Sequence, residues 1–152
     1  MRDRALAAIL VKLRKERSAL SQAVEAARDA ATNTESQAED SHDTRGVEAS
    51  YLAAGQGKRL AEIDETIVRF EQAMGSLIEL HQLEPVKKKT WVFLAPLGGG
   101  ISFELDGVSG LVVSPASPLG EELQGAAEGA TFSIEVAGGT QEKTYRIAKI
   151  YA

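Results

Sequence analysis

The sequence predicts an α+β protein with a helical first half and a small sheet in the second half. All four prolines and ten of the 14 glycines fall in residues 85–152, together with short runs rich in β-branched and aromatic residues. Residues 1–84 instead carry apolar side chains three and four positions apart. Because the two compositions are segregated, we expect a helical domain over 1–84, a linker over 85–89 and a sheet domain over 90–152.

Two apolar stripes in the first half predict two long helices. One stripe covers residues 6–31, and the other runs from Leu60 to Leu77. Each stripe is one seam wide, so each helix needs a partner, and the simplest partner is the other helix folded back as an antiparallel coiled coil. The turn of this hairpin, its tip, is expected near residues 40–46, where Gly46 can adopt the left-handed conformation that ends a helix.

Charge is distributed unevenly along the predicted hairpin. The chain has 22 acids, 17 bases and a net charge of −5, which argues against a broad basic face for nucleic acid. Acids gather around the tip and bases at the foot. Between positions 25 and 48 there are seven acids (25, 29, 35, 39, 40, 43, 48) against two bases (28, 45), whereas the first 17 residues hold six bases (2, 4, 12, 14, 15, 17) against two acids (3, 16).

Metal chemistry in this chain must rely on carboxylates. The chain has no Cys and only two His, His42 in the expected tip and His81 in the expected helix foot. Thiolate and His-rich metal sites are therefore excluded. Carboxylates at a protruding point can bind a hard cation such as Mg²⁺, which keeps several of its waters. No run of about 18 apolar residues exists, so no membrane-spanning helix is expected.

The second half predicts five strands and one short helix. Ser117 is the expected N-cap of that helix, with Pro118 at its first position. Trp91 and Phe93 are expected in the core. Tyr51, in the first half, is expected to pack near the seam between the long helices. The predicted strands cover residues 90–94, 100–105, 110–114, 130–136 and 143–151.

Several segments together resemble one protein family. Residues 113–120 read VSPASPLG, residues 123–130 read LQGAAEGA, and a Gly138-Gly139 turn precedes KTYRIAKI at 143–150. With residues 48–54 in the first half, their order and spacing resemble the Gre-type bacterial transcript cleavage factors over nearly the whole chain. The resemblance implies an antiparallel coiled-coil hairpin followed by a small FKBP-like α+β domain.

The resemblance also implies a function as an accessory factor, not an enzyme. Such factors dock the small domain at the rim of the secondary channel of core RNA polymerase, and Ser117, Pro118 and Leu119 match the docking segment. The hairpin enters the channel, close to the RNA 3′ end and the DNA template, and stimulates cleavage of backtracked RNA. The tip carboxylates would help to hold an Mg²⁺ shared with the polymerase active site. None is expected to be bound in isolation. A monomeric cytoplasmic protein without membrane contact is expected.

The tip departs from the family pattern and leaves alternatives open. Asp43, Asp40 and Glu48 are the candidate catalytic carboxylates, and Asp43 and Asp40 the candidate metal ligands. Alignment on Tyr51 puts Thr44 and Val47 where the two family acids belong, whereas alignment on Asp43 recovers one acid and puts Gly46 at the second position. Asp43 also suits a plain N-cap.

The departures leave open a second hypothesis beside cleavage, a channel-binding regulator or inhibitor that stimulates no cleavage. A peptidyl-prolyl isomerase, which would need an aromatic-lined proline pocket, is a third hypothesis. A coiled-coil interaction module that dimerises through its helices is a fourth.

Overall fold

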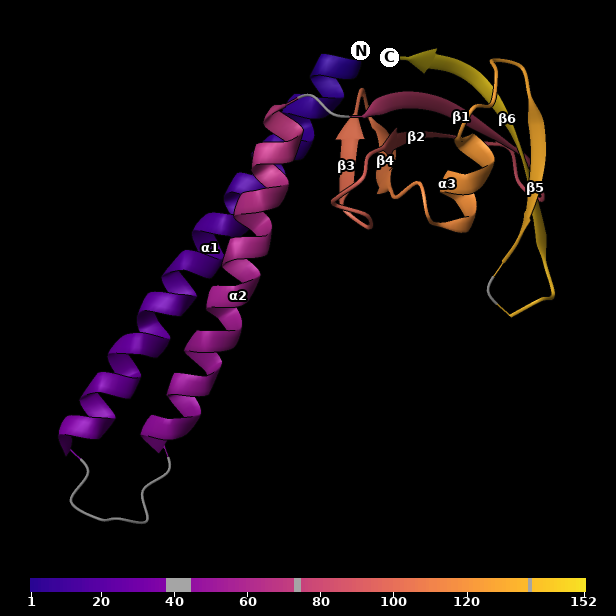
Figure 1. Ribbon diagram of the computed structural model, residues 1–152. Coiled ribbons are helices and arrows are strands. Elements are labelled where there is room, and N and C mark those ends of the chain that lie inside the picture. The colour runs from indigo at the N-terminus through magenta and orange to yellow at the C-terminus, as the bar shows by residue number, and fades with distance from the viewer. Residues whose placement is uncertain (38–44, 73–74, 137) are drawn as a thin grey trace. The chain divides into compact units, whose positions relative to one another are not determined.

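A computed structural model describes residues 1–37, 45–72, 75–136 and 138–152, with side chains described outside 31–50. The predicted α+β class is confirmed (Figure 1). Two long helices come first, α1 (Arg2–Gln37) and α2 (Arg45–Glu71). The remaining elements are β1 (Ser76–Glu84), β2 (Lys88–Leu94), β3 (Ser102–Leu105), β4 (Val108–Val113), α3 (Pro118–Leu123), β5 (Thr131–Glu135) and β6 (Glu142–Tyr151).

The chain forms two compact units whose boundaries lie inside the long helices. One unit, the sheet unit, combines Met1–Val11 with Arg69–Ala152, and the second unit is Lys12–Val68. This division differs from the expected boundary after residue 84, because the start of α1 groups with the sheet. None of the helices in the described ranges has the length and apolarity that crossing a membrane requires.

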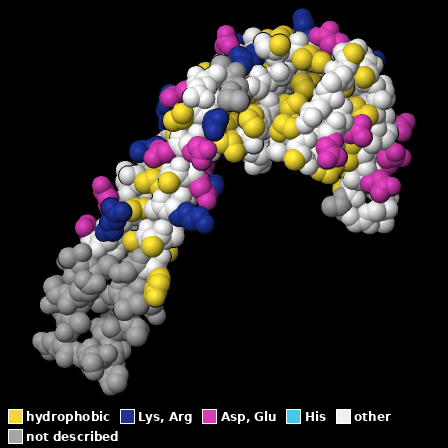
Figure 2. Space-filling model, viewed as in Figure 1, with side chains coloured by type: hydrophobic (Ala, Val, Ile, Leu, Met, Phe, Trp, Pro, Cys, Tyr) yellow, Lys and Arg dark blue, Asp and Glu magenta, His cyan; other side chains and the backbone are white. Residues whose placement is uncertain are grey.

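Within the second unit, α1 and α2 run side by side in opposite directions and form the helix pair (Figure 1). The predicted stripes supply its buried seam. Arg17 forms an ion pair with Asp64, and Glu16 accepts a hydrogen bond from Arg59 at 3.4 Å. The outer surface carries charges of both signs (Figure 2). Side chains at most 8% exposed in this seam are Leu13, Val24, Ala27, Ala53, Ile63 and Ile67.

Tyr51 does not pack in the seam. It is 75% exposed, and Leu52 beside it is 57% exposed, whereas Ala53 is buried. The seam at this level of α2 therefore passes through the small Ala53 side chain, and the expectation for Tyr51 is wrong. The physical reason is the helical period, because a residue two positions from a seam residue lies well over 90° around the helix.

The sheet has the strand order β3-β4-β2-β1-β6-β5, and all neighbours are antiparallel except β2 and β4. One face carries a cluster of buried apolar side chains under α3, including Ile78, Val92 and Ile147. The predicted core positions of Trp91 and Phe93 are confirmed, since these residues are 1% and 0% exposed. The five predicted strands and the short helix are present.

Strand β1 corrects two sequence expectations. Leu77 and His81, expected in the second long helix and at its foot, lie in β1, because α2 ends at Glu71. Lys88 and Lys89, expected in a linker, begin β2. The segment near residue 85 is thus the connection between two paired strands of one sheet, because β1 and β2 are hydrogen-bonded from Ser76 to Gln82.

The start of α1 is fixed to the sheet unit by polar contacts. The Arg2 guanidinium donates a hydrogen bond to the Gly75 carbonyl oxygen at 2.9 Å, and Arg4 forms an ion pair with Asp106. Ala5 and Ile9 on the same segment are 0% exposed. These residues therefore belong to the core of the sheet unit although they lie far from it in sequence.

Candidate functional site

The predicted docking segment forms the beginning of α3. Ser117 is extended, with φ −81° and ψ 157°, and its hydroxyl oxygen accepts a hydrogen bond from the Gly120 N–H at 3.1 Å. The same hydroxyl donates to the Ser114 carbonyl oxygen at 2.7 Å. The predicted N-cap is confirmed. Because Ser117 fixes both the preceding turn and the first helical turn, the Pro118 and Leu119 side chains are held on a defined support.

Gly120 allows α3 to approach the preceding turn closely. A Cβ atom added there would lie 1.9 Å from the Ser114 carbonyl oxygen and 2.9 Å from the Pro115 Cα. Both distances are shorter than a Cβ atom tolerates to a non-bonded neighbour, because carbon atoms in contact lie about 3.5–4.0 Å apart. The Pro-Leu-Gly sequence thus combines a fixed backbone angle at Pro118 with a side-chain-free position at Gly120, and both hold the segment against the sheet unit.

An open, mainly apolar pocket of about 410 Å³ lies beside this segment. Ser117, Pro118 and Leu119 form one wall, and β4 contributes Leu111, which is 41% exposed. Ile134 of β5 also lines the pocket. Exposed apolar hollows of this kind are suited to bury apolar side chains of a binding partner. The three predicted docking residues therefore lie together on one exposed, mainly apolar surface.

The described lining of this pocket is poor in ionisable and aromatic side chains. Glu135 is its one ionisable side chain among the described residues, and no His or Lys lies beside Ser117 there to activate its hydroxyl. The residues described as lining it include no aromatic side chain. Trp91, Phe93 and Phe103 are at most 7% exposed and belong to the core. The described lining of the pocket beside α3 therefore differs from the aromatic-lined pocket that a prolyl isomerase would need.

The predicted tip carboxylates lie outside the described part of the chain. Asp40 and Asp43 fall in residues 38–44, and Glu48 is a residue of α2 whose side chain is not described. Among the side chains that are described, no three His, Asp or Glu residues gather as a metal site. The Mg²⁺ site at the tip stays a prediction from the sequence.

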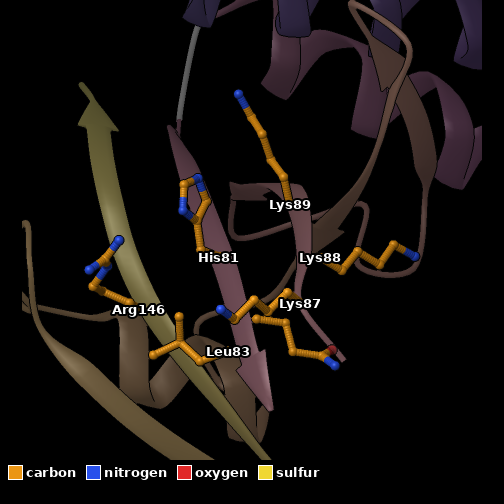
Figure 3. A pocket seen from close by; sticks show the side chains of 7 residues that line it. His81, Leu83, Lys87, Lys88, Lys89 and Arg146 are labelled. Atoms are coloured by element: carbon orange, nitrogen blue, oxygen red, sulfur yellow. The ribbon is translucent and has the colours of Figure 1, made fainter. Parts of the chain in front are cut away.

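A second pocket, of about 470 Å³, was not foreseen from the sequence. It lies where β1, β2 and β6 meet, and it is lined by basic side chains from all three strands (Figure 3). The sequence predicts a helix foot at His81 and a linker at Lys87, and it indicates no role for Arg146. The run Lys87-Lys88-Lys89 was the available signal, but only the pairing of the strands brings Arg146 to it.

Comparisons with known proteins found similarity at the level of solved structures. No protein-family model and no curated protein sequence matches the chain. Gfh1 of Thermus aquaticus is 20% identical, with 96% of each chain covered and a TM-score of 0.38. The GreA factor homolog 1 (Gfh1) protein of Thermus thermophilus is 20% identical, with 94% of each chain covered and a TM-score of 0.36.

A further structure of the transcription factor Gfh1 is 19% identical, covering 95% of this chain and 94% of that chain with a TM-score of 0.38. The chain is thus similar to these transcription factors over almost its whole length.

Proposed function

We propose that this protein is an accessory elongation factor of bacterial RNA polymerase and not itself an enzyme. In this proposal the helix pair is an antiparallel coiled-coil hairpin, and the sheet unit is an FKBP-like docking domain. One observation carries the proposal. Ser117, Pro118 and Leu119, where the sequence resemblance puts the polymerase contact, form a wall of an open apolar pocket. A protein-binding surface at that segment is what a docking role requires.

The proposal gives each part of the chain a task. The pocket beside α3 binds the rim of the polymerase secondary channel, and the helix pair enters the channel. Asp43, Asp40 and Glu48 then bring carboxylates to the Mg²⁺ of the polymerase active site and stimulate cleavage of backtracked RNA. The nucleic-acid chemistry belongs to the polymerase. The proposed protein is a cytoplasmic monomer that meets the RNA 3′ end only indirectly.

The tip sequence supports a second candidate function. On alignment at Tyr51, Thr44 and Val47 stand where two acids are expected, and neither side chain is a carboxylate. Magnesium prefers anionic oxygen ligands, so such a tip would bind the Mg²⁺ shared with the polymerase weakly. The second candidate is therefore a regulator that occupies the channel and slows the polymerase without stimulating cleavage.

Binding to core RNA polymerase tests the shared part of both candidates. We expect the protein to co-purify with the core enzyme, and Leu111→Ser to weaken that binding about tenfold because it removes an exposed apolar side chain from the pocket. Val86→Ser is the matched control, since Val86 is 67% exposed on the β1–β2 connection. Absence of any complex would reject both candidates, and equal weakening by both substitutions would reject the pocket as the docking site.

A transcript cleavage assay on backtracked complexes separates the candidates. A cleavage factor shortens the RNA in the presence of Mg²⁺, and Asp43→Ala reduces that shortening by about tenfold or more. Asp29→Ala on the exposed surface of α1 is the control and leaves the rate unchanged. Unshortened RNA together with slower elongation identifies the non-cleaving regulator.

A further inference from the structure

A row of basic side chains crosses three neighbouring strands of the sheet. His81 of β1 stands opposite Lys89 of β2 on one side and opposite Arg146 of β6 on the other. Lys87 immediately precedes β2 and lines the same pocket as His81, Lys89 and Arg146. Figure 3 shows Lys87 directed to the side of β1 where Arg146 lies, whereas Lys88 points the other way.

One carboxylate compensates part of this charge. Glu79 Oε1 lies 2.9 Å from His81 Nε2 and 3.1 Å from Lys89 Nζ. The Lys89 ammonium also lies 4.6 Å from the centre of the Trp91 ring. Lys87 and Arg146 have no carboxylate within ion-pair distance among the described residues. The row therefore carries uncompensated positive charge at Lys87 and Arg146.

Lys87 and Arg146 line one pocket without a nearby carboxylate, so an anion bound there would offset their positive charge. The pocket has about 470 Å³ of space, which is in the range of small-molecule sites. We propose that this pocket binds a small oligophosphate, either a free polyphosphate or the phosphate chain of a nucleotide, with Lys87 and Arg146 as its principal ligands. The guanidinium of Arg146 can bind two phosphate oxygens at once, and the ammonium of Lys87 acts as a point charge.

The composition of the pocket favours phosphate over other anions. An oligophosphate concentrates several negative charges in a short length, which matches cations crowded into one pocket. Carboxylates of an acidic peptide are spread along an extended chain at about 3.3 Å per residue. Proteins that bind single-stranded nucleic acid stack bases on aromatic rings. No Phe, Tyr or Trp belongs to the described lining, and Trp91 behind it is 1% exposed.

Calorimetric titration of the full-length protein with tripolyphosphate, at fixed ionic strength and without Mg²⁺, tests the proposal. We expect saturable binding of one tripolyphosphate per chain, weakened tenfold or more in Lys87→Glu/Arg146→Glu. Lys15→Glu/Lys58→Glu is the matched control, because it changes the net charge equally at exposed positions of the helix pair. The control should retain binding within twofold. Arg146→Lys should retain more binding than Arg146→Glu. It keeps the positive charge and loses only the planar guanidinium that can bind two phosphate oxygens at once.

Three further probes, ATP, an oligothymidylate and polyglutamate, distinguish the possible ligands of the pocket. Tighter binding of ATP than of tripolyphosphate would identify a nucleotide, and equal binding would identify the phosphate chain alone. Absence of saturable binding, or equal weakening in both double variants, would overturn the proposal. So would binding of an oligothymidylate or of polyglutamate without binding of tripolyphosphate. Circular dichroism of each variant, whose substituted residues are all exposed, checks that the fold is kept.

Discussion

At the scale of single residues, Gly120 determines how closely α3 can approach the turn before it. A methyl group there would lie 1.9 Å from the Ser114 carbonyl oxygen, and that oxygen already accepts the hydrogen bond of Ser117. We expect Gly120→Ala to lower the free energy of unfolding by about 3 kcal/mol, because backbone must move to relieve the overlap. Urea denaturation measures the change.

Gly99→Ala is the control for this substitution. A Cβ atom at Gly99 would meet Ser114 at 3.7 Å, which is an ordinary van der Waals contact. Its free energy of unfolding should therefore stay within about 0.5 kcal/mol of the parent value. Equal stability of both variants would contradict the close packing described for α3.

Glu79 gives a second prediction for a single residue. Burial raises the pKa of Glu79, but hydrogen bonds from His81 and Lys89 and the charges of these two residues lower it, so the pKa ends below its ordinary value of 4.5. A carboxyl whose pKa is lower in the folded state stabilises the protein above the pKa of the unfolded state, and this stabilisation is lost as pH falls through the folded pKa. Glu79→Gln should therefore cost about 1 kcal/mol at pH 7.

The pH dependence distinguishes this effect from a general loss of packing. The difference in unfolding free energy between the parent and Glu79→Gln should shrink as the pH falls from about 4.5 through the lower pKa of the folded state, where the folded carboxyl becomes protonated. Denaturation series at several pH values measure it. A difference that stays constant down to the acid range would show that the Glu79 charge contributes nothing. Glu104→Gln, on an exposed position of β3, should show no comparable difference.

At the scale of elements, neighbouring residues of α2 separate the contributions of packing and charge in the helix pair. Ile63 is 2% exposed in the seam, whereas the Asp64 side chain is 46% exposed in its ion pair with Arg17. Ile63→Ala should lower the free energy of unfolding by about 3 kcal/mol. Asp64→Ala should leave it nearly unchanged, because water and salt screen exposed ion pairs. Thermal denaturation followed by helical circular dichroism compares the two, and a larger loss in Asp64→Ala would contradict this ranking.

The elements also show how far the sequence predicts this fold. Five strands and α3 follow from local signals, such as the alternation in β5 and the cap at Ser117. Strand β1 does not follow from a local signal. It lies between β2 and β6 in the sheet, and side chains on both of its faces are buried, including the successive Leu77 and Ile78. A strand buried on both faces shows no alternation. Leu77 also continues the helical spacing of α2, so only the pairing partners of β1 distinguish it from a helix.

The same distinction between local and distant signals applies to the candidate sites. Ser117, Pro118 and Leu119 could be selected from the sequence because capping and a fixed proline angle act within one turn. The basic row could not, because Lys89, His81 and Arg146 become neighbours only through the registers of two strand pairs. A charge run such as Lys87–Lys89 is recognisable in a sequence, but the residues that meet it across a sheet depend on the whole topology.

At the scale of the whole molecule, the helices belong to two units that can be tested separately. The sheet unit contains Met1–Val11 and Arg69–Ala152, so it does not require the middle of either helix. A variant in which a short Gly-Ser loop replaces residues 23–57 keeps the pairs of Arg17 with Asp64 and of Glu16 with Arg59. It also keeps every residue of the apolar pocket beside α3. We expect its sheet unit to stay folded.

The shortened variant separates docking from action in the proposed function. It keeps the pocket that we propose to bind RNA polymerase and lacks Asp40, Asp43 and Glu48. It should therefore bind core polymerase within about threefold of the full-length protein and compete with it, yet neither shorten backtracked RNA nor slow elongation. Leu111→Ser in the shortened variant should weaken this competition about tenfold. Loss of polymerase binding on shortening alone would instead place the principal contact on the helix pair, because the sheet unit and its pocket are unchanged.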